Sequence, residues 1–137
     1  LVGSEMCIRD RHEDSTLRKA QNNLVQVYRK LGKKEKAYQT AKDLCAKHTL
    51  YDIGWNTLGV LELERGDIPA AKKSFLRSLE IRPYSISVWV NMGNVAFLTK
   101  DYDSARYWWQ RVLLEEPSHT HANDGLKEIE RLQHIKP

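Results

Sequence analysis

The chain has 137 residues, of which 41% are apolar, and it carries 22 lysines and arginines against 18 aspartates and glutamates. This size and composition fit one soluble domain with a packed core, and no run approaches the roughly 18 apolar residues of a membrane-spanning helix. Two cysteines are too few for a disulfide scaffold, and 7 glycines with 4 prolines argue against a many-turned β-sandwich or barrel. The composition therefore favours an all-helical domain.

The first eleven residues, Leu1 to Arg11, resemble the read-through translation of a transposon-end adapter used to prepare sequencing libraries. The run Met-Cys-Ile-Arg-Asp-Arg corresponds to the transposon end itself, and the alternative is an ordinary frayed N-terminus. We expect residues 1–11 to be a non-native segment that packs on nothing, and residues 12–137 to be the folded domain. The native N-terminus would then be missing, which leaves the compartment open, with the cytoplasm favoured.

A period of 34 residues runs through the chain. Residues of the same kind recur one period apart: Trp55 and Trp89, Gly59 and Gly93, Ala71 and Ala105, Phe75 and Trp109, Leu79 and Leu113, Pro83 and Pro117. A fixed period between 20 and 50 residues is the signature of a repeat architecture. The spacing W-x2-L-G, then A-x3-F, then P resembles the tetratricopeptide-repeat family over residues 52–85 and 86–119. The resemblance implies that each repeat is a helix, a short turn and an antiparallel helix.

One period earlier, residues 18–51 form a divergent repeat. Leu24, Tyr28, Gly32 and Ala37 fall on family positions, whereas Gln21, Val25, Ala41 and Thr49 replace the tryptophan, the close-packing glycine, the aromatic residue and the proline. We expect the two helices of this repeat to be packed less tightly or tilted differently.

Residues 120–137 are too short for another helix pair. Leu126, Ile129 and Leu132 recur there at helical spacing, which predicts a capping helix that solvates the end of the stack. The predicted fold is an all-α, right-handed α-solenoid of about three antiparallel helix pairs and this cap.

Small residues and turn residues follow the same period. Gly59 and Gly93 lack a Cβ atom, so we expect the first helix of each pair to approach the second closely there. Gly32 and Gly66 lie where the first helix must reverse, a place that suits a left-handed backbone. Lys100 occupies that place in the third repeat, and we expect local strain at it.

No catalytic pattern is found in the sequence. It contains no phosphate-binding glycine loop, nucleophile elbow, zinc-protease helix or Cys-x-x-Cys pair, so we expect no enzyme activity, no cofactor and no metal. His119 and His121 could begin a metal site, but a solvated linker pair is the favoured interpretation. Cys45 aligns with leucines one and two periods later, which indicates a core residue in preference to a reactive thiol.

The resemblance implies a concave groove lined by the first helices of successive repeats, which holds a peptide. The positions that carry over are Lys19, Asn22, Gln26, Arg29 and Lys30 from the first repeat, Ile53, Asn56, Val60, Leu63 and Glu64 from the second, and Ser87, Val90, Asn94, Phe97 and Leu98 from the third. The alternative for each residue is that it only faces solvent or a neighbouring helix. Several are apolar where a solvated face should be polar, and the interleaved asparagines could bind a peptide backbone.

Positive charge is concentrated at one end. Residues 18–51 carry nine lysines or arginines against two acidic residues, whereas residues 52–85 carry five against five and residues 86–119 three against four. This asymmetry suggests a ligand with an acidic portion near Lys19, Arg29 and Lys30 and an apolar portion near Val90 and Phe97, although much of the charge could simply be solvated. The Lys and Asn pattern of the chaperone-tail clamp found in some relatives is not reproduced, so a chaperone C-terminus is not the expected ligand.

Trp108 aligns with Ser74 and Thr40, which suggests an outward-facing side chain. It packs beneath the capping helix, or it belongs to a contact surface on the convex side.

Three functions remain open. The leading one is a non-catalytic module that binds a protein or peptide in its groove. The second is a fragment of an enzyme, such as a transferase or kinase, whose catalytic domain is missing. The third is a nucleic-acid-binding helical repeat, against which the core positions of the aromatic residues argue. A membrane is not an expected partner, and self-association through the ends of the stack is possible.

Overall fold

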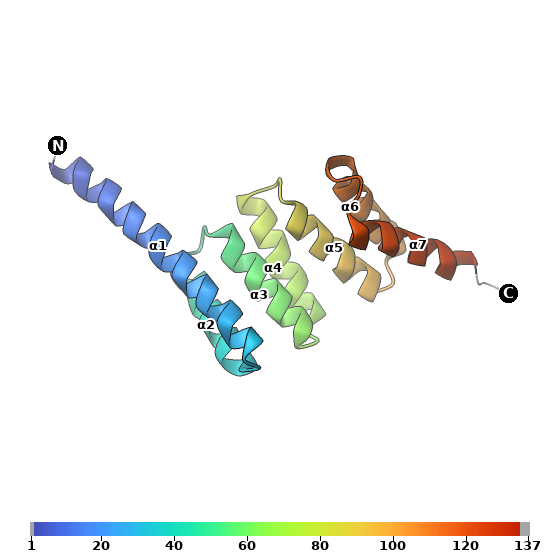
Figure 1. Ribbon diagram of the computed structural model, residues 1–137, viewed down its shortest axis with the longest axis horizontal. Helices are drawn as coiled ribbons and strands as arrows, with labels where there is room; N and C mark the ends of the chain where they lie inside the picture. Colours follow the sequence, from blue (N-terminus) through green and yellow to red (C-terminus); the bar gives the residue numbers. More distant parts are fainter. Residues whose placement is uncertain (1, 135–137) are drawn as a thin grey trace.

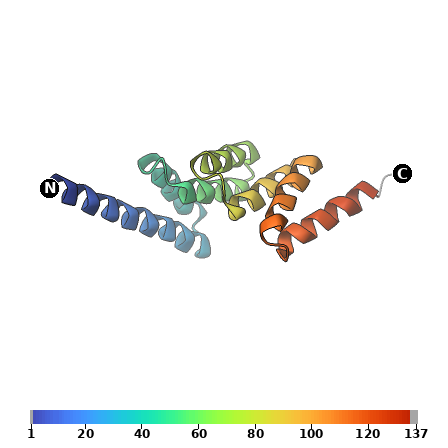
Figure 2. The ribbon, with the colours of Figure 1, turned by 90° about the horizontal axis from the view of Figure 1, so that it is seen from above.

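A computed structural model describes the backbone of residues 2–134 and the side chains of residues 14–134. All regular structure in this part of the chain is helical, which confirms the all-α prediction. The helices are α1 (Val2–Lys30), α2 (Lys34–Lys47), α3 (Asp52–Glu64), α4 (Ile68–Ile81), α5 (Ile86–Leu98), α6 (Tyr102–Glu115) and α7 (Thr120–His134). They follow one another along an elongated molecule whose termini lie at opposite ends (Figures 1 and 2).

The 34-residue period appears directly in where the helices begin. The first helices α3, α5 and α7 begin at residues 52, 86 and 120, and the second helices α2, α4 and α6 begin at residues 34, 68 and 102. Pairs α1/α2, α3/α4 and α5/α6 are helical hairpins, and the helices stack as a solenoid. None of the described helices has the length and apolarity needed to cross a lipid bilayer.

The prediction that residues 1–11 pack on nothing concerns side chains outside those that the structure describes, and it stays a prediction. The backbone from Val2 onward continues α1, whose N-terminal part projects beyond the other helices in Figures 1 and 2. Residues 135–137 of the predicted cap also lie outside the described part of the chain.

Glycines bring the two helices of a hairpin together. A Cβ atom built on Gly59 would lie 2.5 Å from Cε1 of Phe75, and one built on Gly93 would lie 2.3 Å from Nε1 of Trp109. The aromatic ring in each case occupies the space that a side chain would need, as the sequence predicted. Trp109 also meets Gly125 of α7 at 2.4 Å, so this ring is held between glycines of two helices.

In the first repeat the large and the small residue are exchanged. Val25 on α1 and Ala41 on α2 replace the glycine and the aromatic residue of the later repeats, and both have no exposed surface. They pack with Ala37, Leu58 and Leu61 in one cluster. A larger residue on one helix is thus matched by a smaller one on the other, and the expectation that this repeat is packed less tightly or tilted differently stays a prediction.

The turns within the hairpins have a left-handed residue, as predicted. Gly32 and Gly66 have φ of 75° and 81°, and Lys100 has φ of 61°. A non-glycine residue in this region is strained by its Cβ atom.

Polar side chains cap the N-termini of three helices, α4, α6 and α7. The carboxylates of Asp67 and Asp101 accept the backbone N–H groups of Ala70 and Ser104 at 3.3 and 3.2 Å. Nδ1 of His119 accepts the N–H group of Ala122 at 3.2 Å in the same way, so this histidine caps α7.

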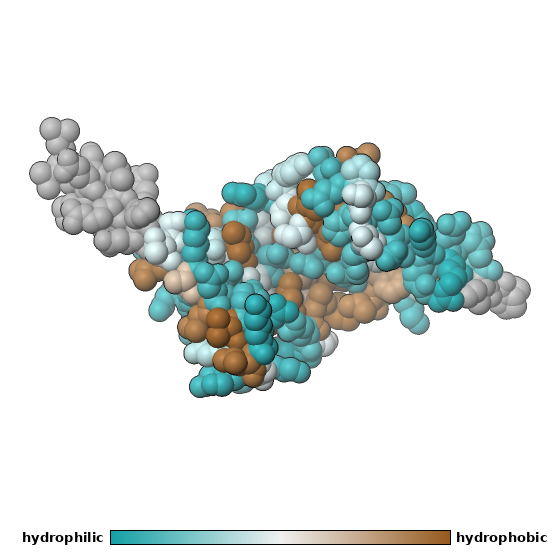
Figure 3. All heavy atoms as spheres, viewed as in Figure 1, coloured by the Kyte–Doolittle hydropathy of each residue, from teal (hydrophilic) through white to brown (hydrophobic). Residues whose placement is uncertain are grey.

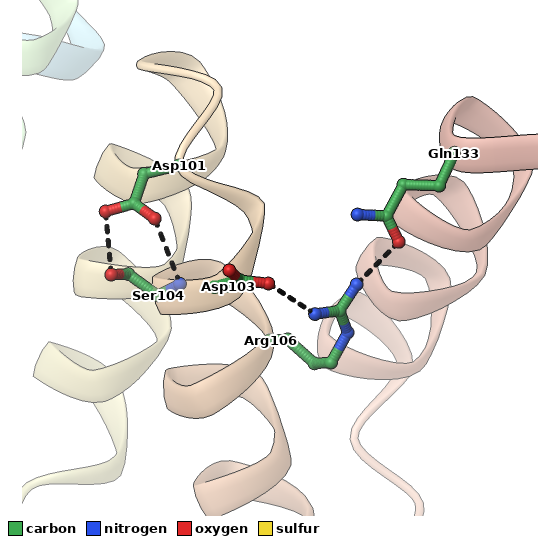
Figure 4. A network of polar contacts seen from close by, with 5 residues as sticks. All are labelled: Asp101, Asp103, Ser104, Arg106 and Gln133. Carbon is green, nitrogen blue, oxygen red and sulfur yellow. Dashed lines mark hydrogen bonds and ion pairs between the residues drawn. The ribbon is translucent and has the colours of Figure 1, made fainter. Parts of the chain in front are cut away.

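Helix α7 is tied to α6 by apolar and polar contacts. Ile129 is buried in the cluster that contains Trp109. On the surface, Arg106 donates to Asp103 at 2.9 Å and to Gln133 of α7 at 2.6 Å (Figure 4). The capping helix is therefore an integral part of the packed domain.

The remaining two assignments concern Trp108 and Cys45. Trp108 is half-buried and packs against the clusters around Trp89 and Phe75, which favours its packing role. Cys45 is buried, and desolvation raises the pKa of its thiol to about 12. A thiol with this pKa is protonated at neutral pH, as expected of a core residue.

Candidate functional site

The fifteen predicted groove residues lie on α1, α3 and α5, and none of them is fully buried. Six are exposed: Lys19, Lys30, Ile53, Glu64, Ser87 and Leu98. Nine are half-buried: Asn22, Gln26, Arg29, Asn56, Val60, Leu63, Val90, Asn94 and Phe97. Half-burial is what the wall of a groove requires, since each side chain must contact its neighbour and still face outward.

Hydrogen bonds between asparagines and the next first helix connect the repeats. Oδ1 of Asn22 accepts the hydroxyl of Thr57 at 2.7 Å, and Oδ1 of Asn56 accepts the side-chain amide of Asn91 at 2.8 Å. These two bonds use equivalent positions one period apart. Oδ1 of Asn94 bonds Nε2 of His121 at 2.6 Å. The asparagines, predicted as ligands for a peptide backbone, thus use one oxygen each to fix the spacing of the repeats.

The groove changes from charged to apolar along the stack. Arg29 forms an ion pair with Glu64 across α1 and α3. One period later the equivalent positions are Leu63 and Leu98. The ion pair between α1 and α3 is therefore replaced by two leucines at the equivalent positions of α3 and α5.

A small hollow lies at the charged end, between α1, α2 and α3. Its volume is about 270 Å³, and it is lined by Gln26, Arg29, Lys30, Lys34, Leu61 and Glu64. Arg29 is engaged by Gln26 as well as by Glu64. Lys30 and Lys34 form no ion pair with any described residue, so this end keeps uncompensated positive charge.

A larger hollow lies at the apolar end, where α3, α5 and α7 meet. Its volume is about 480 Å³, and it is lined by Leu63, Asn94, Phe97, Leu98, Trp109, His121, Asp124, Gly125 and Glu128. Apolar side chains also gather on the middle of the face shown in Figure 3. The structure thus brings four of the predicted residues, Leu63, Asn94, Phe97 and Leu98, into one concave site.

Sequence reasoning missed the contribution of α7 to this site. Continuing the period by one step places His121, Asp124 and Glu128 at the positions of Ser87, Val90 and Asn94. The prediction treated this segment only as a solvating cap, although the period already marked its inner face. Asp124 is exposed, and Glu128 is paired with Arg131, which holds the pKa of the Glu128 carboxyl below its ordinary value. The rim of the apolar hollow is therefore acidic.

The two hollows differ in their lining, which is charged at the α1 end and largely apolar at the α7 end. Among the described residues, no three histidine, cysteine, aspartate or glutamate side chains gather as a metal site would require. His119 and His121 take part in the capping and inter-helix hydrogen bonds given above.

Comparison with known proteins supports the repeat assignment. Residues 19–45 match the family described as tetratricopeptide repeat. No curated protein sequence matches the chain.

Solved structures share the fold at low sequence identity. The first tetratricopeptide domain of Spaghetti (RPAP3), bound to the HSP90 peptide SRMEEVD, has a TM-score of 0.80 at 14% identity over 85% of this chain and 93% of that one. The domain of Arabidopsis OM64 has a TM-score of 0.79 at 13% identity, with 86% and 98% covered. The Yersinia enterocolitica type III secretion chaperone SycD, in complex with a peptide of the translocator YopD, has a TM-score of 0.75 at 16% identity, with 87% and 95% covered.

The helical hairpins at a 34-residue period accompany both the family match over residues 19–45 and the shared fold. The chain therefore has the α-solenoid fold of tetratricopeptide-repeat structures, with helical hairpins and a seventh helix, and its sequence matches that family's model over residues 19–45.

Proposed function

We propose that this protein is a non-catalytic interaction module that binds a peptide segment of a partner protein along the groove of α1, α3, α5 and α7. The observation that carries the proposal is the 480 Å³ hollow in which Leu63, Phe97 and Leu98 meet Trp109. Apolar side chains grouped in a concave site can bury an anchor residue of a ligand, and such burial supplies most of the free energy of peptide binding.

The charges of the groove give the ligand a direction. Lys30 and Lys34 favour an acidic segment at the α1 end, while Asp124 favours a basic residue beside the apolar anchor at the α7 end. Complementary charge of this kind orients a ligand and raises its rate of association more than its affinity.

The relatives support a peptide as the ligand class. By their descriptions, the RPAP3 domain binds an HSP90 peptide and SycD binds a peptide of YopD. The groove positions of this chain hold Asn22, Gln26, Thr57, Ser87 and Asn91 in place of the chaperone-tail clamp, and Thr57 and Asn91 are already bonded to Asn22 and Asn56. We therefore do not expect an HSP90-type C-terminal tail as the ligand.

Selection of peptides from a random displayed library against the full chain tests this function. We expect enriched peptides with an acidic segment and one large apolar residue. Leu98→Asp should weaken their binding at least tenfold, because it puts a charge into the apolar hollow at an exposed position that the fold does not need. The triple variant Asn56→Ala, Leu63→Ala, Phe97→Ala should also lose binding.

Leu50→Asp is the matched control. Leu50 is 70% exposed in the connection between α2 and α3, so the same substitution there should leave peptide binding unchanged. Equal binding by the wild-type chain and the Leu98→Asp variant would show that the groove is not the binding surface.

A further inference from the structure

A further hollow lies on the outer side of α6. Its volume is about 670 Å³, and it is lined by Tyr107, Gln110, Arg111, Leu113 and Leu114. Two of its apolar side chains face solvent, since Tyr107 is 56% exposed and Leu114 is 82% exposed. At 100° per residue, both lie opposite the side of α6 that is buried in the core. We call Tyr107, Arg111 and Leu114 the α6 surface.

Aromatic rings hold Arg111 in place at this hollow. Its guanidinium carbon Cζ lies 4.1 Å from the ring centre of Trp89 and 5.9 Å from that of Trp108. Nη1 donates to the hydroxyl of Tyr107 at 3.5 Å, but Arg111 forms no ion pair with any residue in the described part of the chain. A guanidinium stacked on rings presents its N–H donors in a fixed plane, which suits bidentate binding of a carboxylate.

The equivalent arginine of the preceding repeat has the partner that Arg111 lacks. Arg77 lies one period earlier on α4, where its Nη1 is 3.0 Å from a carboxylate oxygen of Glu80 and its Nη2 donates to the carbonyl of Thr49 at 3.3 Å. Leu114 stands one period after Glu80. This exchange removes the carboxylate and puts an exposed apolar side chain in its place. Arg111 is therefore available to a carboxylate of another molecule.

A further repeat would not cover the α6 surface. The positions equivalent to Tyr107 and Leu114 are Lys73 and Glu80 on α4, and Gln39 and Ala46 on α2. All four are exposed, although a complete hairpin follows each of these two helices in the stack. Stacking therefore leaves this side of a second helix in solvent, whatever follows it.

The α6 surface is too small for a stable dimer and is separate from the proposed peptide groove. It has two exposed large apolar side chains, whereas a stable protein–protein interface takes about 20–30 residues from each side. The apolar hollow of the groove is lined by Trp109, which points to the opposite side of α6. A short segment of another protein thus fits the α6 surface better than a second copy of the chain does.

Apolar area and positive charge meet at this surface. Tyr107 and Leu114 can bury a large apolar side chain, and Arg111 beside them can pair with a carboxylate. The carboxylate one turn further along α6, that of Glu115, is engaged by the hydroxyl of Tyr84. The complementary ligand therefore brings both an apolar and an acidic side chain.

We propose that the α6 surface binds a short acidic segment of a partner protein, in which a large apolar side chain lies next to an aspartate or glutamate. The apolar side chain packs between Tyr107 and Leu114, and the carboxylate pairs with Arg111 as Glu80 pairs with Arg77. The protein then has two binding surfaces, the groove and the outer side of α6.

Fluorescence anisotropy with the full chain tests this proposal. The probe is a labelled peptide Gly-Asp-Leu-Phe-Glu-Leu-Gly, and the matched peptide has asparagine and glutamine in place of its two acidic residues. We expect saturable binding of the acidic peptide and at least tenfold weaker binding of the neutral one. The difference should shrink as salt is added, because salt screens the pairing with Arg111.

Leu114→Glu should weaken binding of the acidic peptide at least tenfold, because it gives Arg111 the intrahelical partner that Arg77 has in Glu80. Leu50→Glu, at a position that is 70% exposed, is the matched control and should bind normally. Arg111→Gln is a second variant, in which the acidic and neutral peptides should bind equally. The groove variant Leu98→Asp should bind the acidic peptide as the wild-type chain does, so either proposal can fail alone.

Three results would overturn the proposal. The first is absence of binding, and the second is equal binding of the acidic peptide by the wild-type chain and the Leu114→Glu variant. The third is a dimer in sedimentation equilibrium that Leu114→Glu converts to monomer, since a second copy would then be the occupant.

Discussion

At the residue scale, the packing rests on pairs of complementary size. Gly59 accommodates Phe75, Gly93 accommodates Trp109, and in the first repeat Val25 is matched by Ala41. Protein interiors are packed as densely as crystals of small molecules, so each pair leaves no room for an added methyl group. Glycine inside a helix costs about 1 kcal/mol relative to alanine, and these positions tolerate that cost because the ring needs the space.

Gly59→Ala should lower the free energy of unfolding by about 1–3 kcal/mol, because its methyl group would lie 2.5 Å from the Phe75 ring. The measurement is urea denaturation followed by circular dichroism. Gly54→Ala is the control: its methyl group would lie 3.2 Å from the ring edge of Tyr51 and 3.3 Å from a methyl of Leu44, so helix propensity should make this variant neutral or more stable. Equal losses at both positions would contradict the argument.

Glu62 should make stability depend on pH. This carboxyl is buried on α3 and accepts the hydroxyl of Ser74 at 2.5 Å. Desolvation raises its pKa above the ordinary 4.5, and the Ser74 hydrogen bond opposes this only in part. A raised folded pKa means that the contribution of Glu62 to stability is complete below the unfolded pKa and is lost as pH rises through the folded one.

Glu62→Gln should therefore gain stability relative to the wild-type chain as pH rises from 4 toward 7. Urea denaturation of both proteins across this range measures the difference between their free energies of unfolding. The other carboxyls titrate in both proteins, so their contribution cancels in this difference. A difference that stays flat with pH would show that Glu62 titrates normally in the folded protein.

At the element scale, each hairpin is defined by how its helices stop and start. A left-handed residue reverses the chain in each hairpin, and in the second and third hairpins Asp67 and Asp101 then accept the N–H group three residues on. The third turn departs from this pattern, because Lys100 adopts φ of 61° where the earlier turns use glycine.

Lys100→Gly should stabilise the protein by about 0.5–1 kcal/mol, because relief of the left-handed strain exceeds the entropy cost of glycine. The reciprocal change Gly66→Lys should destabilise it by a similar amount. Open space around Gly66 means that backbone strain alone is tested there. Thermal unfolding of both variants measures the effect, and a loss of stability in Lys100→Gly would contradict it.

At the scale of the whole molecule, α7 acts both as a cap and as a wall of the binding site. Ala122 and Ile129 complete the core around Trp109, and Asp124 and Glu128 form the rim of the apolar hollow. In a solenoid each repeat buries its apolar face only against its neighbours, so an end without a cap exposes core surface.

Truncation after Glu116 should therefore remove two properties together. We expect a lower midpoint of thermal unfolding and self-association, detected by light scattering, because the Trp109 cluster becomes exposed. Peptides selected on the full chain should also lose binding. Truncation after His134 is the control, since it keeps α7 and should preserve both properties.

The sequence by itself determined the period, the hairpins, the left-handed turns and the glycine-to-aromatic contacts. These features are local or repeat with the chain, so residue spacing alone specifies them. It also predicted Leu63, Asn94, Phe97 and Leu98 as groove residues, which the structure brings into one hollow.

Only the tertiary structure decided how neighbouring repeats use the same positions. The asparagines proved to hold adjacent first helices together, Arg29 proved to be paired with Glu64, and α7 proved to line the hollow. Contacts of this kind depend on the angle and distance between stacked hairpins. Those quantities are set by the packing of all the interfaces at once, and no single segment of the sequence encodes them.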